Sequence, residues 1–328
     1  MTSPSTNTLD HIVHLSHPGA LDETISQFRE LGFNVISGGT HADGLTSNAL
    51  VVNCYPIVSP RLLFTQKVQI FEDGTYLELL NFVKPAASYP AGSPERAKRD
   101  SHPWAPKNPG WIDFAFLGTG EDKHSGGTGV ISEIINARSK DVRYLGEVAG
   151  GRETPAGEIL KWLITSPAKQ HGRGVLPFYC GDVTPREWRV SDSASMNLQL
   201  DDLGYHQVPV TQENTAHPNA AKGVAYIVLL VSSDNLALLS RQVTTIIGAP
   251  ANHVDDELSW SLETIRSTRP AGQLRLRSPK TEEEQSFLDS NIDANVGIYE
   301  VGIWVDAGKS KEPVSLPHTR IVWQSIIN

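Results

Sequence analysis

The sequence has few cysteines and no long apolar run, and each shortage excludes a class of protein. Only two cysteines, Cys54 and Cys180, occur in 328 residues, so a disulfide framework or a four-cysteine zinc site cannot form. No segment approaches the roughly 18 apolar residues of a membrane span, and residues 1–10 lack the apolar stretch of a secretory signal. We therefore expect a cytoplasmic protein with no membrane partner.

Basic residues are also in deficit. Lys and Arg number 28 against 37 Asp and Glu, which gives a formal net charge of −9. Such a charge repels phosphate backbones, so we expect no nucleic-acid partner. The sequence also lacks a nucleophile elbow, a phosphate-binding loop and a zinc-protease helix motif.

What is present is one pattern that recurs about every hundred residues. An apolar strand, an amphipathic helix and several further strands follow one another in residues 9–83, in 111–182 and, less clearly, in 220–305. Residues 84–110 form a Pro-rich connection between the first two segments. The pattern predicts an α+β fold of paired modules that build a site between their sheets.

Residues 53–67 separate two expected strands by more than a usual hairpin loop of about 2–5 residues. They are either a genuine loop near the site or sequence retained from an intron in the gene. The sequence leaves both interpretations open.

Two residues interrupt apolar strand faces. His11 lies among Leu9, Val13 and Leu15, and is either a hydrogen-bonded core histidine, a metal ligand or an acid/base group. Glu78 shares a predicted strand face with Tyr76. An unpaired buried carboxylate is costly, so Glu78 is exposed, paired or bound to a metal.

Three further histidines lie in or near the first module, and only His41 is a candidate for function. His41 and Asp43 lie in the glycine-containing segment 38–44, which is either a polar turn or a loop at the rim of a site. The strand stops at Gly38 and Gly39 in this interpretation. We expect His14 and His17 to be solvated, because strand alternation points His14 away from His11.

Taken together, several motifs resemble the glyoxalase-like family of the vicinal oxygen chelate superfamily, in its fungal form. They are Leu9–Val13, Gly38–His41 with Asn48–Leu50, Asp73–Leu79, Gly151–Glu158 and Leu176–Tyr179. The resemblance covers about residues 9–190 and implies one domain of two βαβββ modules, residues 9–83 and 111–182. Residues 220–305 would then add a third, related module that packs on the others or mediates a homodimer.

The resemblance also implies a site. A first-strand histidine and a last-strand glutamate of a module hold a divalent metal in this superfamily, and the matching positions are His11 and Glu78. Asp113 and Asp182 are candidate supplementary ligands, because Gly181 stands where we expect a polar ligand. His41 and Glu78 are the candidate catalytic residues. The candidate substrate contacts are Asp43, Asn48, Tyr76, Trp104 and Phe178.

These residues suit metal-assisted chemistry on a small oxygenated molecule. An ion with open positions stabilises an enolate-like state during isomerisation, elimination or ring closure and opening. Histidine and carboxylate ligands fit Zn, Fe, Mn or Ni alike. Two alternatives stay open: a protein that binds a small molecule without metal, and a metal-free acid/base enzyme in the same cleft.

Overall fold

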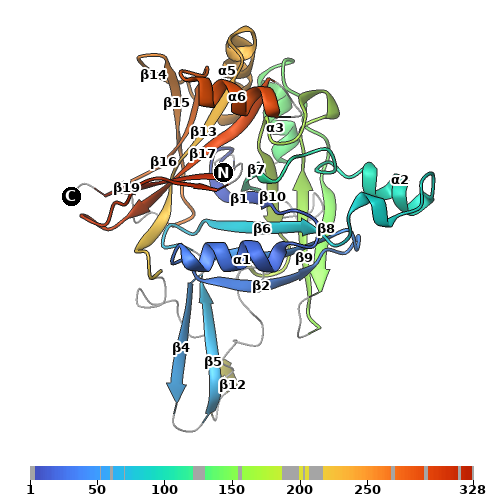
Figure 1. Ribbon diagram of the computed structural model, residues 1–328, viewed down its shortest axis with the longest axis vertical. Coiled ribbons are helices and arrows are strands. Elements are labelled where there is room, and N and C mark those ends of the chain that lie inside the picture. The colour runs from blue at the N-terminus through green and yellow to red at the C-terminus, as the bar shows by residue number, and fades with distance from the viewer. Residues whose placement is uncertain are drawn as a thin grey trace.

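The computed structural model describes residues 4–51, 53–59, 62–69, 71–120, 130–153, 157–186, 199–201, 204–206, 217–266, 270–291, 295–316 and 319–326. Within 53–69 and 199–206 it describes the backbone alone. The fold is α+β, with two large sheets and few helices (Figure 1).

The N-terminal sheet has eight strands in the order β2-β3-β6-β1-β7-β10-β9-β8 and contains two βαβββ modules. The first comprises β1 (Leu9–Leu15), α1 (Leu21–Glu30), β2 (Val35–Thr40), β3 (Thr46–Val51) and β6 (Tyr76–Phe82). The second comprises β7 (Gly110–Leu117), α3 (Ile131–Arg138), β8 (Val148–Glu153), β9 (Ile159–Thr165) and β10 (Phe178–Asp182). The first strands β1 and β7 pair antiparallel, and each pairs in parallel with the last strand of its own module.

The edges of this sheet meet. His41 and Arg152 form an antiparallel bridge, and the Ala42 N–H donates to the Gly151 carbonyl at 3.0 Å. We call this contact between residues 40–42 and 151–153 the seam. It brings the two edge regions, near β2 and β8, together and closes the curled sheet around an interior.

The C-terminal sheet repeats this arrangement in shortened form, in the order β14-β15-β16-β13-β17-β19-β18. Its first module comprises β13 (Ala221–Val231), α5 (Ser233–Ile247), β14 (Asn252–Val254), β15 (Glu257–Leu262) and β16 (Gly272–Arg277). Its second part comprises β17 (Val296–Val305), β18 (Val314–Leu316) and β19 (Thr319–Ser325). β17 pairs antiparallel with β13, as β7 does with β1, and the described residues 306–313 after it hold no helix.

This pairing changes the place of β17. From the sequence, we grouped this strand with the module of residues 220–305. In the structure, β17 begins a further, incomplete module that continues to Ser325. The connection between modules carries a helix in both halves, α2 (Pro94–Asp100) and α6 (Glu282–Ser290).

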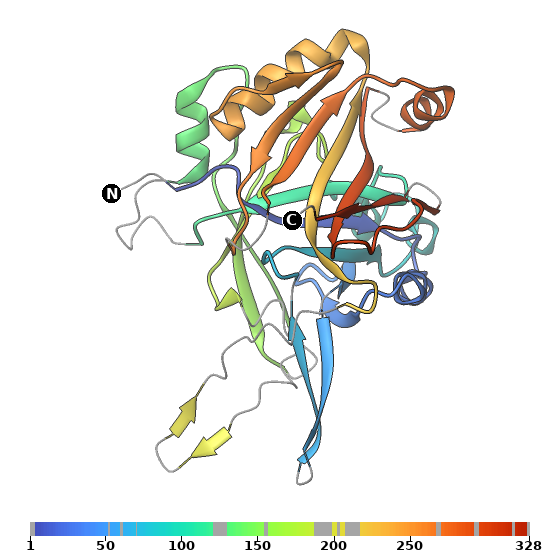
Figure 2. The same ribbon diagram turned by 90° about the vertical axis from the view of Figure 1, so that its left-hand side faces the viewer.

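The remaining elements are short or peripheral. They are the 3-10 turns η1 (Ala86–Ser88) and η3 (Lys169–His171), and the two-stranded pairs β4 (Asn53–Ser59) with β5 (Leu62–Gln69) and β11 (Gln199–Asp201) with β12 (Gly204–His206). The segment 53–67, which the sequence leaves unexplained, therefore falls largely within a hairpin that extends away from the two sheets (Figure 2).

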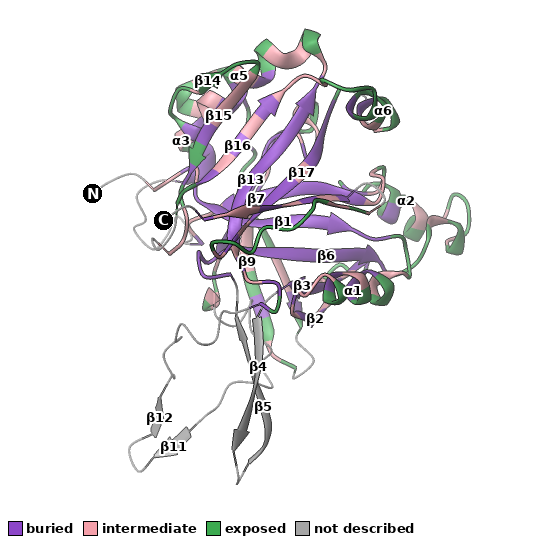
Figure 3. Ribbon diagram, turned by 60° about the vertical axis from the view of Figure 1, so that its left-hand side comes forward, coloured by how far each residue is buried: buried purple, intermediate pink, exposed green. Residues whose placement is uncertain are grey.

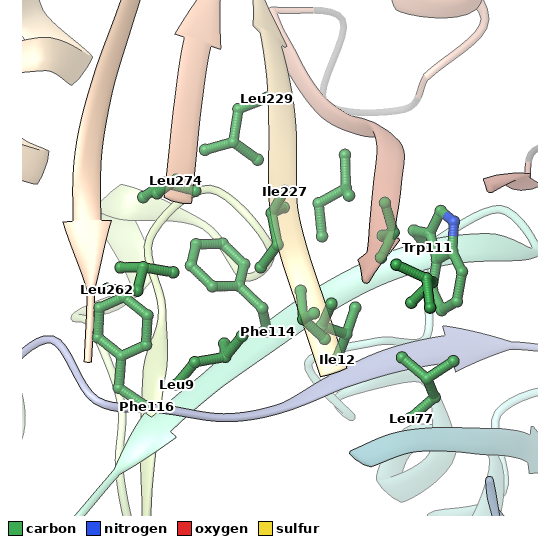
Figure 4. Packing of buried hydrophobic residues seen from close by; sticks show 14 of the residues in the cluster. Leu9, Ile12, Leu77, Trp111, Phe114, Phe116, Ile227, Leu229, Leu262 and Leu274 are labelled. Atoms are coloured by element: carbon green, nitrogen blue, oxygen red, sulfur yellow. The ribbon is translucent and has the colours of Figure 1, made fainter. Parts of the chain in front are cut away.

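The main core lies between the two sheets. Leu9, Ile12 and Phe114 from the N-terminal sheet pack with Ile227 and Leu274 from the C-terminal sheet (Figure 4). All seven residues of β1 are buried, because one face meets this core and the other faces the closed interior (Figure 3). Among the described residues, no helix has the length and apolarity to cross a membrane.

Two predictions about β1 and β2 are wrong. His14 is buried rather than solvated, and its Nε2 lies 2.7 Å from the Thr319 hydroxyl of the C-terminal sheet. His17 is exposed as expected. β2 also does not stop at Gly38 and Gly39 but runs to Thr40.

Candidate active site

A cavity of about 70 Å³ lies inside the closed N-terminal sheet, and we call it the inner cavity. Strand pairing explains which residues reach it: β1 and β6 run parallel with His11 opposite Tyr76 and Val13 opposite Glu78, so their side chains share one face. The lining residues are His11, His41, Asn48, Leu50, Tyr76, Glu78, Trp104, Arg152, Trp162, Ile164, Phe178 and Cys180.

Glu78 lies between two histidines. Its Oε2 is 3.6 Å from His11 Nε2, and its Oε1 is 3.6 Å from His41 Nε2. Both distances exceed the roughly 2.7–3.2 Å of a direct hydrogen bond. The carboxylate and the two ring nitrogens therefore face one small, largely buried space.

The second ring nitrogen of His11, Nδ1, contacts a buried carboxylate on the side away from the cavity. His11 Nδ1 lies 2.6 Å from the Asp10 carboxylate, which is fully buried and also pairs with Arg186. Because an ionised carboxylate can only accept a hydrogen bond, Nδ1 of His11 donates to Asp10 and Nε2 faces the cavity. Arg186 also donates to the Gly74 carbonyl at 2.9 Å, which ties this arrangement to the turn before β6.

His41 is placed by the seam and by Thr46, whose hydroxyl lies 2.7 Å from His41 Nδ1. Its Nε2 is thereby directed toward Glu78. Burial lowers the pKa of His41 below its ordinary value, and the carboxylate of Glu78 opposes that shift. A neutral imidazole can accept a proton or bind a metal ion.

Asn48 fixes the orientation of Glu78. Its side-chain NH₂ donates to Glu78 Oε1 at 2.5 Å, and its carbonyl oxygen accepts from the Gly39 N–H at 3.1 Å. A Cβ atom at Gly38 would lie 2.0 Å from that same oxygen. Glycine is therefore needed at position 38 because the Asn48 side chain crosses the strand there.

Aromatic side chains line much of the cavity wall. Tyr76 stacks on the His11 ring with centroids 4.8 Å apart, and Phe178 meets that ring edge-on at 5.4 Å. Trp104 and Trp162 complete the wall. Such a lining excludes water and strengthens the interactions of the few polar groups inside.

The structure brings together most, but not all, of the residues singled out from the sequence. His11, His41, Asn48, Tyr76, Glu78, Trp104 and Phe178 line one cavity. Asp43 is not among the lining residues: it accepts from the Leu45 N–H at 2.9 Å, and its carboxylate is 3.9 Å from His102.

Asp113 and Asp182, the supplementary ligands expected from the resemblance, also do not line this cavity. The carboxylate of Asp113 is fully buried and accepts from Arg173 and from Trp104 Nε1, both at 2.7 Å. Asp182 lies 3.3 Å from Arg186. Both carboxylates are paired with arginines.

Gly181 has a steric explanation. A Cβ atom there would lie 2.2 Å from the Gly120 backbone nitrogen, so no side chain fits where β10 passes the segment after β7. Strand alternation directs Phe178 and Cys180, rather than Gly181, into the cavity. Position 181 could not have supplied a ligand to this cavity without moving the backbone.

Sequence reasoning missed Arg152, Trp162 and Cys180 as lining residues. Arg152 and Trp162 belong to β8 and β9, and only closure of the sheet brings them to His41. The structure explains the glycine opposite Trp162: a Cβ at Gly150 would lie 2.3 Å from the indole nitrogen, so the ring rests on a glycine of the neighbouring strand.

The chain belongs to the glyoxalase-like domain family, whose model matches residues 9–52 and 60–243. This places it in the vicinal oxygen chelate superfamily. No curated protein matches it significantly.

Among solved structures, a hypothetical protein from Staphylococcus aureus shares the fold, with a TM-score of 0.58, 12% identity, and coverage of 97% of this chain and 99% of the other. A mutant of 4-hydroxymandelate synthase from Streptomyces coelicolor matches with a TM-score of 0.43 and 12% identity, over 92% of this chain and 71% of the other. Methylmalonyl-CoA epimerase from Mycobacterium tuberculosis matches with a TM-score of 0.27 and 15% identity, over 57% of this chain and 95% of the other. These three structures are bacterial, and the fungal form stays a prediction.

His11, His41 and Glu78 of the inner cavity are residue types that bind divalent metal ions. Among the described residues, no three His, Cys, Asp or Glu side chains are gathered closely enough to form a ligand cluster. Two imidazole nitrogens and one carboxylate are nevertheless a recurring donor set for such ions. Bonds of about 2.1 Å place neighbouring ligand atoms roughly 3 to 3.4 Å apart, slightly less than the 3.6 Å from each histidine nitrogen to Glu78.

Proposed function

We propose that this protein is an enzyme that moves a proton on a carbon atom next to a carbonyl group of a small oxygenated molecule. The supporting observation is the carboxylate of Glu78 between the Nε2 atoms of His11 and His41 in a buried, aromatic-walled cavity. Membership of the glyoxalase-like family is consistent with this chemistry but does not specify the reaction.

His11 and Glu78 would hold a divalent ion, with His41 as a third donor or as the residue that moves the proton. When bound, such an ion would polarise the substrate carbonyl as a Lewis acid. Asp10 contacts Nδ1 of His11 and so directs Nε2 toward the cavity, and Asn48 holds the carboxylate of Glu78 in place.

The proton transfer itself needs a base close to the substrate carbon. His41, neutral because burial lowers its pKa, accepts the proton through Nε2 while the C–H electron pair moves toward the carbonyl oxygen. Return of the proton to the opposite face of the same carbon gives epimerisation. Where that carbon carries a hydroxyl group, transfer of the hydroxyl proton to the enolate oxygen and return of the carbon-bound proton to the former carbonyl carbon give isomerisation. Loss of a leaving group from the carbon on the other side gives elimination. The aromatic wall excludes the water that would otherwise compete.

The test combines metal analysis with hydrogen exchange. Purified protein should hold about one divalent ion per chain after incubation with Zn, Fe, Mn and Ni, and should exchange the hydrogens next to the carbonyl of small 2-oxo acids in D₂O. His11→Ala and Glu78→Ala should lose both the ion and the exchange. His41→Asn should lose exchange but keep most of the ion if its main role is proton transfer.

The exposed His17→Asn is the matched control and should change neither measurement. Full exchange activity in both His11→Ala and Glu78→Ala would overturn the proposal.

A metal-free acid/base enzyme is the second candidate. The 2.5 Å bond from Asn48 to Glu78 Oε1 favours it, because that oxygen already has a partner that a metal ion would have to share. Hydrogen exchange in D₂O that continues after a chelator has removed all metal ions would identify this alternative. The homodimer and the cytoplasmic location stay predictions.

A further inference from the structure

Arg152 brings a positive charge to the inner cavity, and the proton transfer from carbon does not use it. Among the described residues that line this cavity, Arg152 alone carries a permanent positive charge and Glu78 alone carries a carboxylate. Arg152 is only 4% exposed. Its charge therefore acts in a region with little water, where ionic interactions are strong.

The pairing of β8 with β9 directs the Arg152 side chain inward. Gly150 lies opposite Trp162, and residues that face each other across antiparallel strands share one face of the sheet. Arg152 follows Gly150 by two residues and so lies on the same face as Trp162, which lines the inner cavity. Lys161, the neighbour of Trp162 on β9, lies on the opposite face.

Across the seam, the guanidinium of Arg152 lies close to Gly39. A Cβ atom at Gly39 would be 3.3 Å from Arg152 Nη1 and 3.8 Å from its Cδ. Gly39 pairs with Asn48 in the ladder of β2 and β3, and Asn48 lines the cavity and donates to Glu78. Burial lowers the pKa of His41, and the positive charge of Arg152 adds to that lowering. The guanidinium is therefore on the side of the cavity that holds His41.

A guanidinium in this position is suited to a planar anion. Its N–H groups form a rigid fork that matches the two oxygens of a carboxylate, and such paired bonds are stronger than those between neutral groups. The inner cavity, at about 70 Å³, offers the volume of roughly two liquid water molecules. A carboxylate bound by Arg152 must therefore be bonded directly to the carbonyl carbon if that carbonyl is to lie beside His11 and Glu78.

We propose that Arg152 binds the carboxylate of a 2-oxo acid, whose carbonyl group then lies beside His11 and Glu78. The substrate class is thus a short anionic carbonyl compound rather than a neutral one. The positive charge also stabilises the negative charge that develops on the carbonyl oxygen as the proton moves to His41. This inference rests on the proposed function, because it takes the reacting carbonyl to lie between these side chains.

The experiment compares two nearly isosteric ligands by calorimetry with the full chain: oxamate and its neutral amide, oxamide. Oxamate carries a carboxylate where oxamide carries a second amide, so the ratio of their dissociation constants measures the anion contact. The wild-type protein should bind oxamate roughly 10- to 100-fold more tightly, as expected for a charged hydrogen bond. The preference should remain after a chelator has removed all metal ions, because Arg152 provides it.

Two substitutions of Arg152 test this assignment. Arg152→Gln should reduce the preference for oxamate to less than about threefold, because it removes the charge. Arg152→Lys keeps the charge but lacks the planar fork, so it should reduce the preference by about threefold. If Arg152→Gln does not fold, Arg152→Lys decides the question, and an unchanged preference in that variant would overturn the assignment.

Lys161→Gln is the matched control, since Lys161 is an exposed cation on the neighbouring strand and does not line the inner cavity. It should leave both dissociation constants unchanged. A fall in the preference for oxamate as large as that in Arg152→Gln would show that the general charge of this region, and not Arg152, selects the anion.

Hydrogen exchange in D₂O separates this assignment from the proposed function. Equal affinity for oxamate and oxamide, failure of both to bind, or a preference that persists in Arg152→Gln would overturn the role of Arg152. Exchange of pyruvate or hydroxyacetone hydrogens that Glu78→Ala abolishes would then leave the proposed function standing. An oxamate preference that depends on Arg152, without exchange in any carbonyl compound, would instead overturn the proposed function and retain the anion site.

Discussion

Asp10 determines which nitrogen of His11 faces the inner cavity. It lies next to His11 in the sequence, yet its carboxylate reaches back to Nδ1 at 2.6 Å because a register shift interrupts β1 between Leu9 and His11. Partners of this kind fix the tautomer of a metal-binding or proton-accepting histidine. Asp10 is thus a positioning residue rather than one that touches substrate.

Replacing Asp10 with Asn should therefore damage the site while the fold persists. Loss of such a partner reduces metal affinity or activity by roughly 10- to 100-fold. The ¹⁵N NMR shifts of His11 should report a larger fraction of the tautomer protonated at Nε2. Asp22→Asn, an exposed acid on α1, serves as the control, and an unchanged His11 tautomer in Asp10→Asn would refute this role.

Gly181 illustrates a second effect at the residue scale, which is steric. Gly181→Ala should lower the free energy of unfolding by roughly 1–3 kcal/mol, the usual cost of overpacking, because its Cβ would lie 2.2 Å from Gly120 N. Urea unfolding measures this difference. Gly146→Ala has no heavy atom within 4 Å of its new Cβ and should be nearly neutral. Equal stability of the two variants would contradict the steric explanation.

At the scale of elements, the turn before β6 connects the two sheets. Asp73 Oδ1 accepts from the Thr75 N–H at 2.9 Å and from its hydroxyl at 2.7 Å, while Oδ2 accepts from the Val224 N–H of β13 at 3.1 Å. The side chain is buried, and burial raises its pKa to about 6. The turn thereby locks the strand that carries Glu78 against the C-terminal sheet.

Asp73→Ala should leave those donors buried without a partner. Each unsatisfied buried group costs about 1–3 kcal/mol, so we expect the free energy of unfolding to fall by at least about 2 kcal/mol in urea titrations. Asp256→Ala, in the exposed turn between β14 and β15, should change it by less than about 0.5 kcal/mol. A similar small effect in both variants would show that the turn does not connect the sheets energetically.

The sequence predicted elements with strong local patterns. The spacing of Leu21, Ile25 and Phe28 indicated α1, and the first strand of each module was recognisable from its apolar run. Short strands such as β14 and β18 have three residues each and carry no periodicity to detect.

The glycines at positions 38 and 39 misled the sequence interpretation, because Gly38 accommodates the side chain of Asn48 and Gly39 accommodates the backbone carbonyl of Glu153 across the seam. The site could be predicted only in part for the same reason. His11 and Glu78 stand out because each is a polar residue on an apolar face. The pairing of His41 with Arg152 depends on closure of an eight-stranded sheet across 110 intervening residues, which no local pattern reveals.

At the scale of the whole molecule, the packing of the two halves buries two histidines, of which His14 was expected to be solvated. His14 on β1 meets Thr319 of the C-terminal sheet, and His217 accepts from the Asn34 N–H at 3.2 Å. Burial lowers the pKa of each of these two histidines to about 3. Both are therefore neutral in the folded protein at any pH near neutrality.

This arrangement makes the stability of the protein depend on pH. The unfolded chain protonates each histidine near its ordinary pKa of 6.5, whereas the folded protein does so only near 3. The unfolded state thus binds more protons between these two pH values. The contribution of the two neutral histidines to the free energy of unfolding is complete above pH 6.5 and decreases as the pH falls. Asp73 acts in the opposite direction between pH 6 and 3.8, because its raised pKa lets the folded state bind the proton first.

The two histidines should outweigh the single carboxyl group. Each contributes a loss on the order of 2 kcal/mol at pH 5 relative to pH 7.5, against a gain of about 1 kcal/mol from Asp73. Urea unfolding at the two pH values should show the free energy of unfolding falling accordingly. His217→Asn keeps an acceptor for the Asn34 N–H and removes one titrating group, so it should reduce that difference by about 2 kcal/mol. The exposed His17→Asn should leave the difference unchanged, and a His217→Asn variant with the wild-type pH dependence would show that burial between the halves does not produce the acid sensitivity.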